Sequence, residues 1–197
     1  MEDIKEIDID GFLLGERHLF LEGEVTYPTS SELCKSLIAL SQLADDPIKL
    51  WINSGGGSIG AGLALIDLIQ LIKVPIYTII NGNAGSMAAL ISIAGDQRYM
   101  TENSFWMFHD LMAFVSSDGE YGDKLITRCE DYYSKLQNLT ESHLKKHTKL
   151  STKDLHRGRT KELWYFSNDC KKKGIIDRIL KSSSKVRNRG AENVKIF

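Results

Sequence analysis

The sequence is poor in cysteine, has no charge imbalance and contains no long apolar run. Its three cysteines, Cys34, Cys129 and Cys170, are odd in number and have no metal-ligand spacing. Neither a disulfide framework nor a metal site is therefore indicated, and a reducing, cytoplasmic location is expected. We interpret each cysteine as a small packing residue.

Charge and hydropathy exclude two further classes of protein. With 25 lysines and arginines against 26 aspartates and glutamates, the net charge is −1. No bulk attraction to nucleic acid or to a membrane surface is therefore expected. The most apolar stretch, residues 84–95, is too short and too rich in small residues to span a bilayer. The first six residues have no apolar segment, which predicts no signal peptide.

The length and the composition predict one folded domain with two flanking segments. A chain of 197 residues, 42% of them hydrophobic, is long enough to bury a substantial core. Residues 1–17 are polar and weakly patterned, and we interpret them as an N-terminal arm. Residues 18–180 form the predicted domain. Residues 181–197 are basic and rich in serine, glycine and asparagine, which predicts a disordered, solvated tail.

Strand-like and helix-like segments alternate along the predicted domain, which favours an α/β fold built from repeated ββα units. The helix predicted over 123–147 is too long for a connector, so we expect it to project or to pack against another subunit. Strands are predicted at 18–23, 48–52, 74–80, 97–100, 105–108 and 175–180, and the other helices at 33–43, 59–72, from 87, after Ser151 and at 168–173.

Ser86 lies at the junction between a β-branched apolar strand and an apolar helix. A small-residue turn, with Gly82, Ala84 and Gly85, separates the two elements. A serine at such a turn lies near free backbone N–H groups and the positive end of a helix dipole, where an attacking hydroxyl and an oxyanion are both served. The alternative is a helix N-cap, because serine is a favoured residue there.

A second glycine-rich segment, residues 53–58, precedes the helix predicted at 59–72. Three adjacent glycines allow positive φ and a close backbone approach, but they are also typical of a flexible loop or a phosphate-binding loop. No Lys-Ser/Thr pair follows, so the P-loop pattern fails. Gly55, Gly57 and Gly60 match G-x-G-x-x-G, but the acidic residue expected after the next strand is missing.

His109 follows the apolar strand predicted at 105–108. Together with Ser86 and the glycine-rich segment, it supplies the base, the nucleophile and the oxyanion donors that a serine hydrolase requires. The alternative is a core or surface histidine with no chemical role.

Five segments resemble the proteolytic subunit of the ATP-dependent Clp protease, the ClpP family, in their order and separation. The resemblance covers residues 18–180. The matching segments are Phe20–Val25, Trp51–Gly57, Asn83–Ala88, Met107–His109 and Trp164–Asp177.

This resemblance implies a catalytic triad. Ser86 matches the nucleophile and His109 the general base. Counting back from Gly174, the third position, usually aspartate, is occupied by Glu162, which still has the carboxylate that orients a histidine. The alternative for Glu162 is a solvated surface glutamate. Backbone N–H groups of Gly56 or Gly57 and of Met87 would form the oxyanion hole.

Two departures from the family pattern lie beside these positions. Gly55 stands where proline is common, and Asp110 follows His109 where glutamine is common. A carboxylate there would compete with Glu162 to orient His109. These differences indicate an atypical branch of the family.

The resemblance also implies a ClpP/crotonase-like superhelix and a homo-oligomer of heptameric rings, stacked in a double ring through the 123–147 helix. An AAA+ unfoldase would feed polypeptide substrates into the chamber, and neither a cofactor nor a metal is implied. Three alternatives stay open. They are a catalytically impaired ring subunit, a crotonase-like acyl-CoA enzyme, and a membrane-anchored signal-peptide peptidase relative with a Ser/Lys dyad, which the missing transmembrane segment disfavours.

Overall fold

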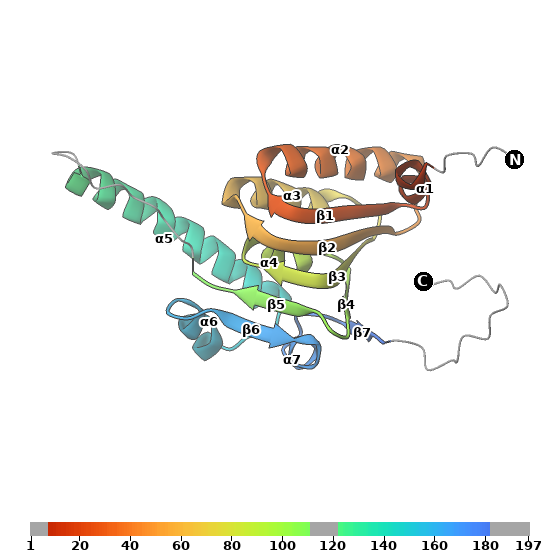
Figure 1. Cartoon of the computed structure of the whole chain (residues 1–197). Coiled ribbons are helices and arrows are strands. Elements are labelled where there is room, and N and C mark those ends of the chain that lie inside the picture. The colour runs from red at the N-terminus through yellow and green to blue at the C-terminus, as the bar shows by residue number, and fades with distance from the viewer. Residues whose placement is uncertain (1–7, 111–121, 182–197) are drawn as a thin grey trace, which may run out of the picture.

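Parallel strands form most of a seven-stranded sheet in the computed structural model, which describes residues 8–110 and 122–181 (Figure 1). The main path has the order β1-β2-β3-β4-β7. The first half of β3 pairs with β4 and its last residues pair with β5, which also pairs antiparallel with β6. The strands are β1 (His18–Val25), β2 (Ile48–Gly57), β3 (Ile76–Gly85), β4 (Gln97–Thr101), β5 (Phe105–Phe108), β6 (Leu163–Phe166) and β7 (Arg178–Leu180).

Three helices cover one face of the sheet. In this layer α2 contacts β1, α3 packs between α2 and α4, and α4 contacts β2 and β3. Helix α5 projects away from the sheet (Figure 1), which confirms the predicted α/β fold with a long projecting helix. The helices are α1 (Ile9–Gly15), α2 (Tyr27–Leu43), α3 (Ile59–Leu71), α4 (Met87–Ser92), α5 (Gly122–His147), α6 (Thr152–Gly158) and α7 (Ser167–Lys172).

Several predicted boundaries were wrong. The glycine-rich segment expected to be a loop is the extended end of β2, which runs to Gly57. Helix α2 begins at Tyr27, six residues before the predicted start at 33, because Thr26 is its N-cap and accepts a hydrogen bond from the Thr29 N–H at 3.3 Å. The last strand is only three residues long and begins at Arg178. Ser151, by contrast, caps α6 as predicted.

The sequence predictions also missed two elements. Residues 163–166 form β6, and helix α1 lies within the segment expected to be a weakly patterned arm. Residues 1–7 of that arm and residues 182–197 of the predicted tail lie outside the described residues.

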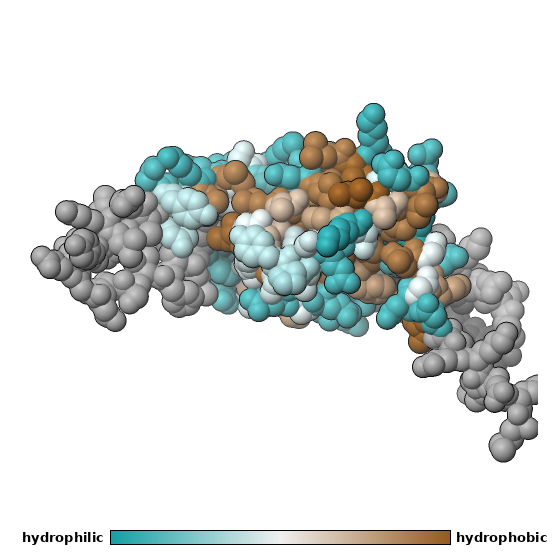
Figure 2. All heavy atoms as spheres, turned by 90° about the horizontal axis from the view of Figure 1, so that it is seen from above, coloured by the Kyte–Doolittle hydropathy of each residue, from teal (hydrophilic) through white to brown (hydrophobic). Residues whose placement is uncertain are grey.

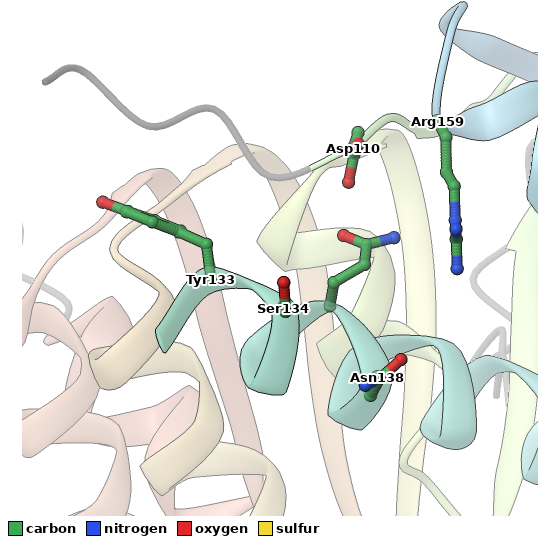
Figure 3. A pocket seen from close by; sticks show the side chains of 6 residues that line it. Asp110, Tyr133, Ser134, Asn138 and Arg159 are labelled. Carbon is green, nitrogen blue, oxygen red and sulfur yellow. The ribbon is translucent and has the colours of Figure 1, made fainter. Parts of the chain in front are cut away.

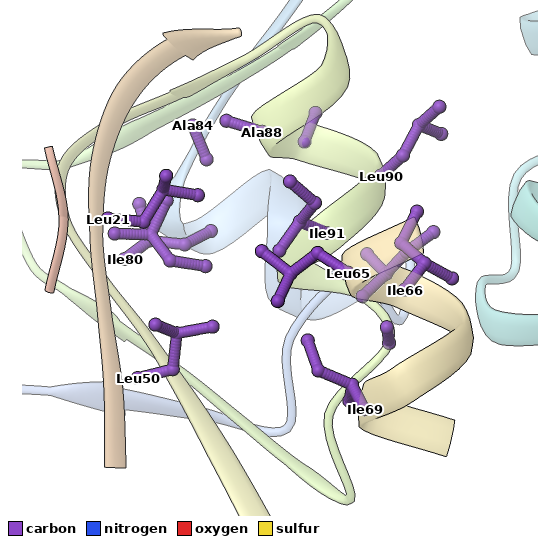
Figure 4. Packing of buried hydrophobic residues seen from close by; sticks show 14 of the residues in the cluster. Leu21, Leu50, Leu65, Ile66, Ile69, Ile80, Ala84, Ala88, Leu90 and Ile91 are labelled. Atoms are coloured by element: carbon purple, nitrogen blue, oxygen red, sulfur yellow. The ribbon is translucent and has the colours of Figure 1, made fainter. Parts of the chain in front are cut away.

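The core lies between the sheet and its helical layer. Leu21, Leu50 and Ile80 project from three adjacent strands, and they face Leu65 of α3 and Ile91 of α4 (Figure 4). All five side chains are buried. Burying each such side chain contributes about 1.5–3 kcal/mol to the stability of the fold relative to exposure. This packed layer therefore holds the carboxyl ends of β2 and β3 in place.

Aromatic side chains gather on the other face of the sheet. His18 and Phe20 each stack on Trp51 there, and Tyr77 contacts Tyr99. Lys49 lies on the same face as Trp51, because side chains two apart on a strand share a face.

Hydrophobic side chains also gather on the surface seen in Figure 2. Helices α1 and α2 contribute exposed Phe12 and Leu43, among others. Between these helices lies a groove of about 720 Å³, lined by Leu14, Leu40 and Arg17 with eight further residues. Arg17 closes the end of α2, because its guanidinium donates to the Leu40 and Ala44 carbonyls at 2.9 and 3.1 Å.

An ion pair joins β4, β7 and the end of α5. Arg98 donates to the Asp177 carboxylate through Nε at 3.1 Å and Nη2 at 2.8 Å, and through its backbone N–H at 2.9 Å. Its Nη1 donates to the His147 carbonyl. Burial by itself would raise the pKa of Asp177, but the hydrogen bonds from Arg98 outweigh that effect and lower it below the ordinary 3.8.

We predict that Asp177→Asn lowers the free energy of unfolding by about 1–2 kcal/mol at pH 7, since hydrogen bonds to a charged group are lost and partial exposure screens them. Because the folded pKa lies below the unfolded one, the contribution is complete above pH 3.8 and is lost as the pH falls through the lowered value. Urea denaturation at several pH values measures it. Asp131→Asn is the control: it breaks the exposed Asp131–Lys135 pair and should change stability by less than about 0.5 kcal/mol.

Candidate active site

Ser86 lies in a strained turn between β3, which ends at Gly85, and α4, which begins at Met87. Its backbone has φ 51° and ψ −119°, a conformation that costs a non-glycine residue about 1–3 kcal/mol. The Ser86 N–H donates to the Met107 carbonyl of β5 at 2.8 Å, which holds the turn against the sheet. Ser86 occupies the N-cap position of α4, but its side chain makes no capping hydrogen bond. The hydroxyl is therefore not used for the structural role that the sequence left open.

The end of β2 approaches this turn more closely than a side chain would permit. A Cβ on Gly56 would lie 2.7 Å from the Ser86 Cβ, 2.7 Å from the Gly85 carbonyl oxygen and 2.8 Å from the Met87 nitrogen. Gly56 also has φ 101°, which favours glycine. The structure thus brings Gly56, Ser86 and Met87 together.

Gly57 faces a different neighbour. A Cβ there would meet the Val25 carbonyl oxygen of β1 at 2.4 Å, and Gly57 pairs with Val25 in the sheet. The Gly56 N–H donates to the Ser54 hydroxyl at 3.1 Å, and the Ser54 side chain is buried. Ser54 was not among the predicted site residues. Its position two residues before Gly56 could have indicated this contact, because a serine side chain often forms a hydrogen bond with the backbone two residues further along the chain.

His109 follows β5 at the same edge of the sheet as Ser86. Gly85 pairs with Met107, so Ser86 and His109 both lie just beyond this last pair. The ring is half-buried, and its Nδ1 lies 2.5 Å from the Asp110 carbonyl oxygen. Because a carbonyl only accepts, this contact assigns the proton to Nδ1 in the neutral ring, the tautomer whose Nε2 can act as a general base. No hydrogen bond joins Ser86 to His109 within the described residues.

Glu162 and His109 directly adjoin the same strand pair. The antiparallel register of β5 with β6 runs from Phe105 with Phe166 to Phe108 with Leu163, so His109 follows this last pair and Glu162 precedes it. The Glu162 carboxylate accepts a hydrogen bond from the Trp164 indole Nε1 at 3.0 Å at an exposed position. Among the described residues it makes no hydrogen bond to His109. No strand was predicted here, although three consecutive residues of high strand propensity, Trp164–Phe166, were available as a signal.

Two interactions fix the segments that carry these residues. The Asp110 N–H donates to the Gly158 carbonyl at 2.9 Å, which ties the end of β5 to α6. Arg159 Nε donates to Glu141 Oε1 of α5 at 2.6 Å. This hydrogen bond from Arg159 lowers the pKa of Glu141, whose side chain is largely buried.

In residues 8–110 and 122–181, no group of three or more described histidine, cysteine, aspartate or glutamate side chains is placed to hold a metal ion. No helix there is both long and apolar enough to cross a membrane.

Comparison with known proteins identifies the family. The family model described as Clp protease matches residues 2–183, which is most of the chain. The chain belongs to the Clp protease family. The acyl-CoA and signal-peptide peptidase alternatives are therefore not supported, and the ClpP resemblance found in the sequence is confirmed.

Curated Clp protease relatives align along almost their whole length. The ATP-dependent Clp protease proteolytic subunit of Streptococcus suis is 29% identical over 181 residues, covering 89% of this chain and 90% of the relative. The protein of the same name from Streptococcus sanguinis is 28% identical over 183 residues, covering 91% and 92%. The similarity to these Clp protease subunits therefore extends over the whole domain.

We predict that Gly56→Ala destabilises this Clp protease subunit and Gly55→Ala does not. Alanine at position 56 would clash with the Ser86 turn at positive φ and should lower the free energy of unfolding by about 2–4 kcal/mol. A Cβ on Gly55 meets nothing within 4 Å, so alanine there should be neutral or stabilise by up to about 1 kcal/mol. Urea denaturation compares the two. Equal stabilities would contradict the close approach at Gly56.

Proposed function

We propose that this chain is a serine endopeptidase that hydrolyses peptide bonds of unfolded proteins through an acyl-enzyme. The observation that carries the proposal is the turn at Ser86. Its hydroxyl is not used for capping, and its strained backbone lies against Gly56 and beside the first N–H of α4. Strain at a turn of this kind is typical of sites where a nucleophile is presented.

In this mechanism Ser86 Oγ attacks the peptide carbonyl while His109 Nε2 takes its proton. The carbonyl oxygen becomes an oxyanion close to the N–H of Met87, which has no intrahelical acceptor because Met87 is the first residue of α4. The second N–H comes from Gly56 or Gly57. Gly56 is the nearer to Ser86, but its N–H must first leave the Ser54 hydroxyl. His109 then protonates the leaving amine, and water releases the acyl group by the reverse steps.

Glu162 is the third member of the proposed triad. The register of β5 and β6 supports this role, because His109 and Glu162 both directly adjoin the last pair, Phe108 with Leu163. Two rearrangements are required: His109 Nδ1–H must exchange the Asp110 carbonyl for the carboxylate, and Glu162 must leave Trp164. Both are side-chain motions at the exposed ends of two strands. We propose that substrate binding or assembly induces them.

A second candidate function is a catalytically impaired ring subunit. Two observations favour it. Ser86 makes no hydrogen bond to His109 within the described residues, and the Glu162 carboxylate is hydrogen-bonded to Trp164. In that case the Asp110 carbonyl would hold His109 permanently. The two candidates differ in the reactivity of Ser86.

The proposed assembly follows the Clp protease family. We propose a cytoplasmic homo-oligomer of heptameric rings, stacked in a double ring, with α5 at the contact between rings and an AAA+ ATPase that delivers unfolded polypeptide. The projection of α5 from the body of the domain supports this role (Figure 1). The reactions proposed for Ser86, His109 and Glu162 require no cofactor.

A fluorophosphonate probe tests the proposed nucleophile. We expect one covalent adduct per chain, measured by intact mass, and none in Ser86→Ala. Ser58→Ala is the matched control: Ser58 also begins a helix after a strand, but its hydroxyl accepts from the Ala61 N–H at 3.4 Å, so labelling should persist. Folded, assembled protein that is not labelled would contradict the peptidase and favour the impaired subunit.

Substitution of Glu162 tests the triad. We expect Glu162→Gln to lower kcat for peptide cleavage by about 10²–10⁴-fold, since an amide does not stabilise the imidazolium that forms in the reaction. Trp164→Phe removes the competing hydrogen bond to Glu162 and should preserve or raise kcat. Glu32→Gln, an exposed change on α2, is the control. Wild-type kcat in Glu162→Gln would assign the orienting role to the Asp110 carbonyl instead.

A further inference from the structure

Helix α6 ends against the strand pair that the proposed base and acid adjoin. His109 follows the last pair of β5 with β6, Phe108 with Leu163, and Glu162 precedes it. Both side chains of this pair are buried. A Cβ on Gly158, the last residue of α6, would lie 2.8 Å from Phe108 Cε1 and 3.4 Å from Leu163 Cδ1. Because the Phe108 ring is packed in the core, an added methyl group would push the end of α6 away from this pair.

Backbone hydrogen bonds tie the neighbours of both proposed residues to α6. The residue after His109 donates its N–H to the Gly158 carbonyl at 2.9 Å. The residue before Glu162 is Lys161, and its N–H donates to the Arg157 carbonyl at 2.9 Å. A shift of the end of α6 therefore moves the backbone next to the proposed base and next to the proposed acid.

Asp154 anchors the beginning of α6 to two other elements. Its carboxylate accepts hydrogen bonds from the Ser151 N–H at 3.0 Å, from Lys173 Nζ at 3.0 Å and from the Tyr165 hydroxyl at 3.3 Å. Ser151 is the N-cap of α6, Lys173 directly follows α7, and Tyr165 lies in β6. Burial by itself would raise the pKa of Asp154, but the hydrogen bonds from Ser151 and Lys173 outweigh it and lower the pKa to about 2. The anchor is therefore ionised at neutral pH.

On the side of α5, the same segment borders a cavity. Asp110 and Arg159 line one side of this cavity of about 250 Å³, and α5 lines the other (Figure 3). Arg159 reaches α5 through a side-chain hydrogen bond to Glu141. An open space permits small movements of its walls, whereas close packing does not. The close-packed support of the segment beside His109 therefore comes from α6.

We propose that α6 sets the spacing between His109 and Glu162, and that Gly158 and Asp154 are positioning residues for the reaction. Gly158 allows α6 to reach the last strand pair, and Asp154 holds the helix there. Both act through the helix, Gly158 at its end and Asp154 one turn earlier. The inference rests on the proposed peptidase function, because the spacing matters only if His109 and Glu162 take part in a reaction.

Gly158→Ala tests the close approach. Alanine is favoured over glycine in a helix, so any loss comes from the contact with Phe108. A misplacement of about 1 Å is enough to lower kcat for peptide cleavage by about 10–100-fold. We expect KM to change by less than about 3-fold, since the spacing is used in the reaction and not in substrate binding. Gly15→Ala is the matched control: Gly15 also ends a seven-residue helix, but its Cβ would meet nothing within 4 Å, so kcat and KM should stay unchanged.

Substitution of Asp154 tests the anchor, and it decides the question if Gly158→Ala does not fold. Asp154→Ala loses all three hydrogen bonds, so kcat should fall by about 10-fold or more at nearly constant KM. Asp154→Asn keeps a side-chain oxygen that accepts hydrogen bonds, so kcat should return to within about 3-fold of the wild-type value. A role in stability alone would lower the free energy of unfolding of both variants and leave kcat unchanged.

Hydrogen exchange, measured by mass spectrometry, shows whether the displacement reaches the end of β5. We expect residues 105–110 to exchange faster in Gly158→Ala than in the wild type, because the Asp110 N–H loses its acceptor. Unchanged exchange, wild-type kcat in the folded variants, or a rise in KM that accounts for the whole loss would overturn the proposal. An inactive wild-type protein contradicts the peptidase itself, and the positioning roles fail with it. An active wild type with unchanged variants overturns the positioning roles alone.

Discussion

The candidate site depends on one close approach between two backbone segments. The distance between them leaves no room for a methyl group. Gly56 at the end of β2 lies against the turn from Gly85 to Met87 at the end of β3, at distances that exclude any Cβ. Parallel strands place their carboxyl ends at one edge of a sheet, so β2 and β3 converge there. The packed core of β1–β3, α3 and α4 holds both ends and offsets the strained backbone of Ser86.

The other half of the site depends on residues far along the chain. His109 directly follows the last pair of β5 with β6, and Glu162 directly precedes that pair. Helix α6 holds Asp110 by a backbone hydrogen bond, and Arg159, just after that helix, is paired with Glu141 of α5. The position of His109, the proposed base, therefore depends on the position of α5. Asp110 and Arg159 also line the cavity next to α5.

Helix α5 is also joined directly to the helix that begins after Ser86. His143 Nε2 lies 3.0 Å from the Leu90 carbonyl oxygen of α4, to which it donates, and the His143 and His147 rings pack together at 4.6 Å. Burial lowers the pKa of both, that of His147 to about 4, so each stays neutral at pH 7. Neutral rings allow the projecting helix to pack on the core without burying charge.

The sequence by itself determined the α/β class, the strand-to-helix junction at Ser86, the cap at Ser151 and the projecting helix, because each depends on local patterning and on the conformational preferences of a few adjacent residues. The turn predicted at Gly82, Ala84 and Gly85 was wrong, since these residues form the end of β3. The order of motifs also determined the family. Tertiary structure decided that Gly56 meets Ser86 whereas Gly57 meets β1, that residues 163–166 form a strand, and that Asp110, Gln137 and Arg159 share a cavity. These facts depend on strand register and helix packing between segments 20 to 80 residues apart, which no local pattern encodes.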